Sequence, residues 1–264
     1  MTAPLDPANR DLAGARVLVT GAASGIGHAV AGRCLAEGAA VGALDLDGER
    51  LTSAIADLRG LGGGRIAPVV ADVSHPGQVS RAVRQLADEL GGLSAVVNVA
   101  GLGGYTGDVA ETSLDAWQRT LAVNLTGVFL VTREALAFLR AEVGASIVNV
   151  SSQYGLVGGA GSPAYIASKA GVIGLTRAMA VDHAEENIRV NCVCPGPTDT
   201  PMLRADRGDS RHSIREDRRT KYRRLLAGVG TPEGVAGAIA FLLGPDAAEI
   251  TGAVFSLDGG WTAS

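Results

Sequence analysis

Short apolar runs alternate with longer helix-like stretches along this 264-residue chain. The runs are apolar throughout rather than at every second position, which is typical of strands buried on both faces of a parallel sheet. They cover residues 15–20, 39–45, 65–71, 93–98, 146–151, 188–193 and 253–258. The stretches between them favour helices, among them residues 25–37, 77–90, 114–140, 163–185 and 231–243. This alternation predicts an α/β fold: a doubly wound, mostly parallel sheet of about seven strands with helices on both faces.

No proline- or serine-rich linker and no internal repeat divides the chain, so we expect one domain over residues 1–264 with a loose N-terminal tail at residues 1–10. In a doubly wound sheet, ligands bind at the carboxyl ends of the strands. Candidate chemistry is therefore expected where the apolar runs end.

Composition narrows the possible functions. Hydrophobic residues make up 47% of the chain, which argues against disorder, and the net charge of −4 gives no support to nucleic-acid binding. The three cysteines and the N-terminus suggest a reducing compartment, and we expect a cytoplasmic protein. Neither cysteines nor histidines have metal-ligand spacing, and no apolar run approaches the length needed to span a membrane.

A glycine-rich turn follows the first apolar run directly, as T-G-A-A-S-G-I-G at residues 20–27. Its glycines let the backbone turn and approach a pyrophosphate, whose charge the following helix N-terminus favours. The spacing differs from the G-x-G-x-x-G fingerprint, so a glycine turn without a ligand remains the alternative. The candidate cofactor-binding residues here are Gly21, Ser24, Gly25, Ile26 and Gly27.

Asp45 ends the second apolar run, at the distance where a carboxylate can accept hydrogen bonds from the adenosine ribose. It would repel a 2′-phosphate, and no basic residue immediately follows it, which favours NAD(H) over NADP(H). The alternative is a solvated acid at the end of a strand. Further candidate cofactor contacts follow the third and fourth runs: Asp72, Val73, Asn98, Ala100 and Gly101.

Tyr165 and Lys169 are four residues apart in a predicted helix, so their side chains share one face. An ammonium beside a phenol favours the phenolate and lowers a pKa that is ordinarily about 10. Ser152 ends the fifth apolar run, where its hydroxyl can hold a carbonyl or alcohol oxygen while Tyr165 moves the proton. By itself the Tyr–Lys spacing is more typical of a solvated surface helix than of a catalytic pair.

In combination, these motifs resemble those of the short-chain dehydrogenase/reductase family over nearly the whole chain. The T-G-x-x-x-G-I-G, Y-x-x-x-K and P-G motifs are present, and the family's N-N-A-G appears as N-V-A-G at residues 98–101. The resemblance implies a Rossmann-like fold that binds NAD(H) and interconverts a secondary alcohol and a ketone by hydride transfer. Two alternatives stay open: a 3-oxoacyl thioester reductase using NADPH, and a catalytically silent nucleotide-binding regulatory protein.

The family's site residues carry over at matching positions. The resemblance makes Tyr165 the acid/base, Lys169 its electrostatic partner and a ligand of the nicotinamide ribose, and Ser152 the residue that orients the substrate oxygen. Asn124 would kink its helix and hold a water that links Lys169 to solvent. Tyr165 and Lys169 join the cofactor contacts, together with residues after the sixth run: Pro195, Gly196, Thr198 and Thr200.

The substrate side is expected by family analogy alone. Its candidate residues are Tyr105, Gln153, Tyr154, Met202 and Leu203, with residues 199–228 as a lid. Residues 204–224 hold nine basic and four acidic side chains, a charge that can attract an anionic substrate. A solvated lid, or one paired with a neighbouring subunit, explains the same charge. The resemblance also implies a homotetramer.

Overall fold

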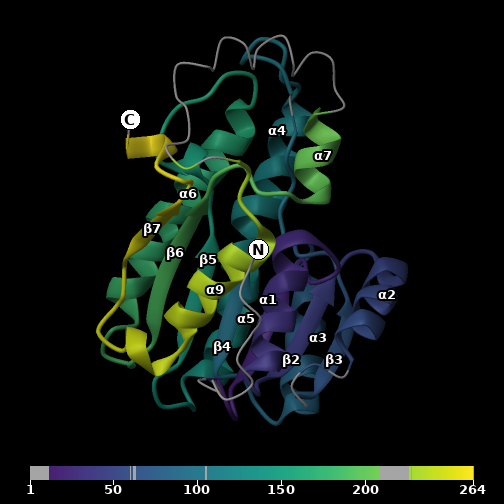
Figure 1. The fold of residues 1–264 in the computed structure, drawn as a ribbon, viewed down its shortest axis with the longest axis vertical. Helices are drawn as coiled ribbons and strands as arrows, with labels where there is room; N and C mark the ends of the chain where they lie inside the picture. The colour runs from purple at the N-terminus through teal and green to yellow at the C-terminus, as the bar shows by residue number, and fades with distance from the viewer. Residues whose placement is uncertain are drawn as a thin grey trace.

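The computed structural model describes residues 12–59, 61, 64–104, 106–207, 226 and 228–263. Over these residues the strands form one parallel sheet of seven strands in the order β3-β2-β1-β4-β5-β6-β7, with helices on both faces (Figure 1). The strands are β1 (Arg16–Thr20), β2 (Ala40–Asp45), β3 (Ile66–Val70), β4 (Ala95–Asn98), β5 (Ser146–Val150), β6 (Arg189–Pro195) and β7 (Val254–Leu257). The α/β fold class expected from the sequence is confirmed, with each strand within an expected run or extending at most two residues past it.

The strand order reverses beside β1, which pairs in parallel with β2 on one side and with β4 on the other. The connection that leaves β1 therefore runs toward β2, and the connection that leaves β4 runs the opposite way, toward β5. This point opens a crevice at the carboxyl ends of the strands, where doubly wound proteins bind their ligands.

Two helical layers enclose the sheet. Helices α1, α2 and α9 share one buried cluster with the strands, and α3, α5 and α6 share another on the opposite face. The longer helices are α1 (Gly25–Ala36), α2 (Gly48–Leu58), α3 (Pro76–Leu90), α4 (Leu114–Leu121), α5 (Gly127–Leu139), α6 (Pro163–Asp182), α7 (Pro201–Arg207) and α9 (Pro232–Leu243). Helices α1 and α9 lie side by side although they are distant in sequence (Figure 1).

The apolar character of the strands follows from these two layers. On β1, Val17 and Val19 pack under α1 and α9, whereas Leu18 between them packs under α3 and α5. Strand β3 departs from this expectation, because Pro68 and Val70 on one of its faces are exposed. It is the edge strand of the sheet, where a proline without an N–H is tolerated.

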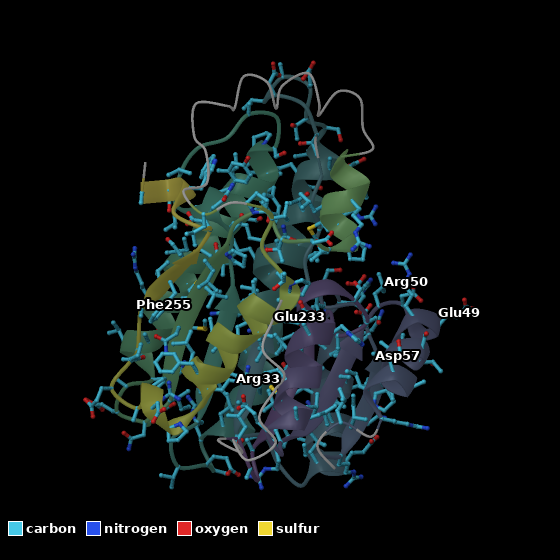
Figure 2. All side chains as sticks on the ribbon, viewed as in Figure 1. Arg33, Glu49, Arg50, Asp57, Glu233 and Phe255 are labelled. Atoms are coloured by element: carbon cyan, nitrogen blue, oxygen red, sulfur yellow. The ribbon has the colours of Figure 1, made fainter. Side chains whose placement is uncertain are left out.

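Helix α2 was not among the helices named from the sequence. Asp47 caps its N-terminus by accepting a hydrogen bond from the backbone N–H of Arg50 at 3.0 Å. Its apolar face is buried under the sheet, while Glu49, Arg50 and Asp57 are exposed (Figure 2). The helix places Arg50 beside the carboxyl end of β2.

Helices α4 and α5 form one continuous helix through a π-helical turn at Ala122–Thr126, called η1. The whole helix, Leu114–Leu139, is long and apolar enough to cross a membrane by length and composition, which the sequence analysis did not anticipate. Core helices meet the same criterion, and the α5 part packs its buried residues with α3 against the sheet.

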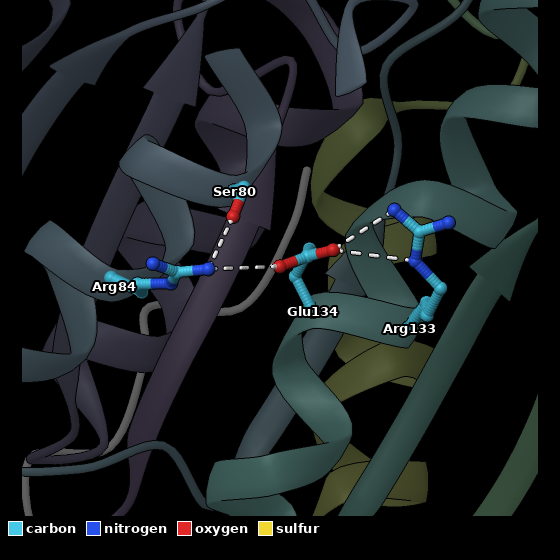
Figure 3. Close-up of polar contacts among 4 residues, drawn as sticks. All are labelled: Ser80, Arg84, Arg133 and Glu134. Carbon is cyan, nitrogen blue, oxygen red and sulfur yellow. Dashed lines mark hydrogen bonds and ion pairs between the residues drawn. The ribbon is translucent and has the colours of Figure 1, made fainter. Parts of the chain in front are cut away.

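A polar cluster joins α3 and α5 at their outer edge. Glu134 pairs with Arg133 at 2.9 Å and lies 3.9 Å from Arg84, which also donates to Ser80 at 2.8 Å (Figure 3). Exposed ion pairs of this kind contribute between nothing and about 1 kcal/mol. The apolar face beneath them therefore holds the two helices together.

Candidate active site

A cleft of about 950 Å³ opens at the carboxyl ends of the strands. The candidate residues named from the sequence all line it, except Asn98, Asn124 and Tyr105. Tyr105 lies outside the described residues, as do the N-terminal tail and residues 208–225 of the expected lid. The fold thus gathers cofactor, catalytic and substrate candidates from across the chain into one cavity.

The glycine turn forms the floor of this cleft at the N-terminus of α1. A Cβ at Gly27 would lie 2.0 Å from the carbonyl oxygen of Gly21, so no side chain fits there. Gly21 has a φ of +69°, and a Cβ on it would lie 3.0 Å from the backbone of Ala100. Ser24 makes no side-chain capping bond to α1. The open helix N-terminus and close-packed turn fit a bound pyrophosphate.

Asp45 lies at the adenosine end expected for the cofactor. Its Oδ2 accepts a hydrogen bond from the backbone N–H of Ala23 at 2.9 Å, and its Oδ1 accepts from that of Asp47 at 3.1 Å. These bonds fix the carboxylate against the glycine turn. Asp47 and Arg50, which the sequence analysis missed, also line the cleft and pair at 3.2 Å. The sequence could have indicated both residues, because they follow Asp45 closely at the end of the second apolar run.

Asp72 borders the same end of the cleft after β3. Burial raises the pKa of its carboxyl, but hydrogen bonds from the hydroxyl and backbone N–H of Ser74 outweigh it, so the net pKa is lowered. The side chain is therefore ionised near neutral pH. Arg119, on α4, lines the cleft nearby and was also missed from the sequence.

Tyr165 and Lys169 lie on α6 and face the cleft, so they are not on a solvated surface helix. The Lys169 side chain is buried, its Nζ lies 5.7 Å from the centre of the Tyr165 ring, and it donates to the carbonyl of Val150 at 2.9 Å. Burial lowers the pKa of Lys169 from 10.5 to about 8. Near neutral pH the ammonium therefore stands beside the phenol in a poorly solvated place.

Ser152 and Ser151 both line the cleft at the end of β5, but they differ in hydrogen bonding. Ser151 donates its hydroxyl to the carbonyl of Lys169 at 2.7 Å. The Ser152 oxygen accepts from the backbone N–H of Tyr154 at 3.2 Å, and its own proton has no acceptor among the described residues. Ser152 is thus the serine that can donate to a ligand.

Asn124 and Asn98 lie behind the cleft wall. Asn124 is buried in the π-helical turn, where its amide binds both backbone groups of Leu102, at 2.7 and 2.9 Å, and donates to Ser168 at 3.1 Å. The π-helical turn lies at the position where the kink was expected, and the amide is engaged locally. Asn98 donates to Asn149 on β5 at 2.9 Å and to Thr132 on α5 at 3.2 Å, and it does not line the cleft.

Trp261 lines the cleft from the C-terminal end of the chain. Its ring contacts Tyr154 edge to face, with 5.8 Å between the centres. Asp258 fixes this turn by accepting hydrogen bonds from the backbone N–H groups of Gly260 and Thr262 at 2.9 Å. No motif in the sequence signals this position, because only the end of β7 brings it to the cleft.

The described part of the lid is α7 with its flanking turn. Met202 and Leu203 face the cleft, and Arg204 forms an exposed two-point ion pair with Asp199 at 2.9 and 3.0 Å. Among the residues that the structure describes, no group of three or more histidines, cysteines and acids could hold a metal ion.

Comparisons with known proteins place this geometry in a family. A sequence profile described as enoyl-(acyl carrier protein) reductase matches residues 21–262. The 2-(S)-hydroxypropyl-CoM dehydrogenase 3 of Xanthobacter autotrophicus is 39% identical over 94% of this chain and 96% of its own. The 3-oxoacyl-(acyl-carrier-protein) reductase of Thermotoga maritima is 38% identical over 94% of this chain and 98% of its own.

The solved structures agree. A short-chain dehydrogenase from Burkholderia cenocepacia, crystallised in complex with NADP, has a TM-score of 0.86 and 35% identity, covering 96% of this chain and 100% of that one. The chain belongs to the short-chain dehydrogenase/reductase family. It is an oxidoreductase of CH–OH groups that uses a nicotinamide cofactor.

Proposed function

We propose that this enzyme is an NAD-preferring dehydrogenase that interconverts a secondary alcohol and a ketone, with Tyr165 as the acid/base. The observation that carries the proposal is the cluster of Ser152, Tyr165 and buried Lys169 in the cleft that begins at the α1 N-terminus. At that N-terminus the turn around Gly27 leaves no room for a Cβ, which fits a backbone packed closely for the pyrophosphate of a dinucleotide.

In alcohol oxidation, Tyr165 as phenolate takes the hydroxyl proton of the substrate while the carbon–hydrogen bond breaks. A bound nicotinamide cofactor would supply the acceptor for the hydride that leaves this carbon. Ser152 donates a hydrogen bond to the substrate oxygen and fixes its position. Lys169 favours the phenolate through its nearby positive charge, and the proton held on Tyr165 then passes to solvent. Reduction of the ketone runs through the same groups in reverse.

Replacing Tyr165 by phenylalanine tests the assignment. We expect Tyr165→Phe to lose at least 1,000-fold in kcat, because general acid–base catalysis contributes on the order of 10²–10⁴ and no neighbouring side chain replaces the phenol. Binding of NADH, followed by its fluorescence, should stay within threefold. Turnover within tenfold of the unchanged enzyme would remove Tyr165 from the mechanism.

The preference for NAD(H) rests on charge. A 2′-phosphate beside the ribose would meet the carboxylate of Asp45, with Asp47 close by, and Arg50, which lines the same cleft, is already paired with Asp47. The NADP-bound relative shows that the family also accommodates the phosphorylated cofactor. Specificity in this chain therefore depends on these few charges.

Steady-state kinetics with both cofactors measures the preference directly. We expect kcat/KM to favour NAD, and Asp45→Ser to lower the NAD-to-NADP ratio at least tenfold by removing the repelling charge. Arg50→Gln is the matched control, because it removes an exposed charge beside the same site and should lower only the use of NADP. A wild-type preference for NADP would refute the proposal.

A 3-oxoacyl thioester reductase is the second candidate function, favoured by the 38% identity to the Thermotoga maritima enzyme. It predicts efficient reduction of acetoacetyl thioesters with NADPH and weak activity on simple alcohols. A panel of thioesters, ketones and alcohols with both cofactors separates the two functions. The catalytically silent alternative predicts no turnover in any of these assays.

We also propose a cytoplasmic homotetramer without a nucleic-acid or membrane partner. Apolar side chains on the outer faces of α5 and α6 support assembly, since Phe129 is 44% and Val181 78% exposed. The three cysteines are free and buried, which suits a reducing compartment. Light scattering after size exclusion measures the assembly, and a monomer at micromolar concentration would contradict it.

A further inference from the structure

The turn that follows β7 places an indole ring at the cleft. Two successive glycines, Gly259 and Gly260, have φ angles of +65° and +83°, a left-handed backbone that other residues rarely adopt. This sharp turn takes the chain from the end of β7 to Trp261, which lines the cleft and is half-buried. The residue therefore keeps accessible surface that a ligand can reach, and the proposed mechanism does not use it.

Several contacts fix this turn. Asp258 is only 2% exposed, and its carboxylate accepts hydrogen bonds from the backbone N–H groups of Gly260 and Thr262 at 2.9 Å and from the Thr262 hydroxyl at 2.5 Å. It also packs against the end of β6, because a Cβ on Gly196 would lie 2.8 Å from the Cα of Asp258. The backbone N–H of Leu226 donates to a carbonyl of the same turn at 3.0 Å. The indole is thus held in place before a ligand binds, which reduces the entropy cost of binding.

Trp261 forms one side of an aromatic corner with Tyr154. The ring centres are 5.8 Å apart and the ring planes cross at 78°. A Cβ on Gly159 would lie 2.6 Å from the Tyr154 ring, so this glycine leaves the space that the second ring occupies. A flat ring that stacks on one of two perpendicular rings presents its edge to the other, and aromatic pairs prefer both arrangements. The corner therefore fits a planar ring better than a puckered saturated one.

The charges of the lining lie away from this corner. Among the described residues, the charged side chains of the cleft are Asp45, Asp47, Arg50, Asp72 and Arg119 toward the adenosine end, and Lys169 beside Tyr165. Met202 and Leu203 add apolar surface from α7. A neutral, apolar group is therefore the occupant that these walls favour.

We propose that Trp261 determines substrate specificity by contacting an aryl group bonded to the reacting carbonyl carbon. The favoured substrates are then neutral aryl ketones and the corresponding benzylic secondary alcohols. This inference rests on the proposed function, since it assigns the reacting oxygen to Ser152 and Tyr165. The backbone N–H of Tyr154 donates to the Ser152 oxygen at 3.2 Å, so the aromatic corner begins beside the position of the reacting oxygen.

The test compares acetophenone with cyclohexyl methyl ketone, which differ in whether the six-membered ring is aromatic. Because the two carbonyls differ in intrinsic reactivity, the readout is the change in the ratio of their kcat/KM values between the wild type and each variant. Trp261→Leu keeps an apolar side chain but loses the aromatic ring, so the ratio of acetophenone to cyclohexyl methyl ketone should fall at least threefold. Trp261→Phe should hold the ratio within twofold of the wild type. Phe241→Leu, which removes an exposed ring on α9 outside the cleft, is the matched control and should leave the ratio unchanged.

A second measurement needs no variant. With NADH saturating, so that the nicotinamide position is filled, benzamide should compete with the ketone and inhibit the wild type at least threefold more strongly than cyclohexanecarboxamide. Equal inhibition by the two amides would contradict the inference whether or not the Trp261 variants fold.

Two further results would overturn the inference. One is an unchanged ratio in Trp261→Leu with NADH binding intact, because the indole would then act on both rings alike. The other is a wild type that reduces cyclohexyl methyl ketone but not acetophenone. By contrast, absence of turnover of these and of aliphatic ketones with NADH and NADPH would count against the proposed function itself.

Discussion

The buried ammonium of Lys169 allows the pH dependence of stability to be worked out from the structure. Its Nζ is enclosed beside β5 and hydrogen-bonded to Val150, and burial lowers its pKa from 10.5 to about 8. That difference corresponds to about 3 kcal/mol, since each pH unit between the two values is worth about 1.4 kcal/mol. The enzyme carries this cost to keep a cation beside Tyr165.

The sign follows from proton binding. Below pH 8 the lysine is protonated in both the folded and the unfolded protein, and the folded state bears the full cost. Between pH 8 and 10.5 the folded state releases the proton while the unfolded state keeps it, so the free energy of unfolding rises with pH. Relative to Lys169→Met, which cannot titrate, the wild type should therefore gain about 3 kcal/mol across this interval.

Urea unfolding of the cofactor-free wild type and Lys169→Met measures this gain at several pH values from 7 to 10.5, at one protein concentration. The lost bond to Val150 is independent of pH, so it offsets the two curves without changing their difference in slope. Repeating the pair in a Tyr165→Phe background removes the neighbouring phenol from the titration. Parallel curves in both backgrounds would show that the lysine is not buried as a cation in the folded enzyme.

Four further substitutions test other parts of the structure. Gly27→Ala should weaken NADH binding more than tenfold, because its Cβ would lie 2.0 Å from the carbonyl oxygen of Gly21. Gly237→Ala in α9 is the matched control, since a Cβ there meets nothing closer than 3.7 Å. It should raise the free energy of unfolding by about 0.5–1 kcal/mol. Arg189→Met should destabilise by about 2 kcal/mol in thermal or urea unfolding, since its guanidinium donates to carbonyls at the C-terminus of α9 at 2.7–3.4 Å, and an unchanged midpoint would contradict this. Asn124→Ala should lower kcat at least tenfold while the KM for the cofactor changes less than threefold, because the loop after β4 loses its anchor; a fall in stability without a kcat effect would make this residue purely structural.

The sequence by itself determined the fold class, because uninterrupted apolar strands separated by helices can be buried only between two helical layers. It also determined the chemistry of the motifs: the glycine turn, Asp45 at the end of β2, and Tyr165 one helical turn from Lys169. Each depends on residues within one short segment, where spacing alone fixes their relation. The same reasoning failed for the exposed face of β3, since an edge strand differs from a central one only through its neighbours.

Only the tertiary structure decided how groups from different segments meet. It buried Lys169, whose lowered pKa depends on packing against β5 and β6, and it separated Ser152 from Ser151 by their hydrogen bonds. It brought Trp261 into the cleft and left Gln153 there without a partner. These properties arise from contacts between segments that are distant in the sequence. A local sequence pattern does not indicate which distant backbone group will pair with a given side chain and which side chain will stay unpaired.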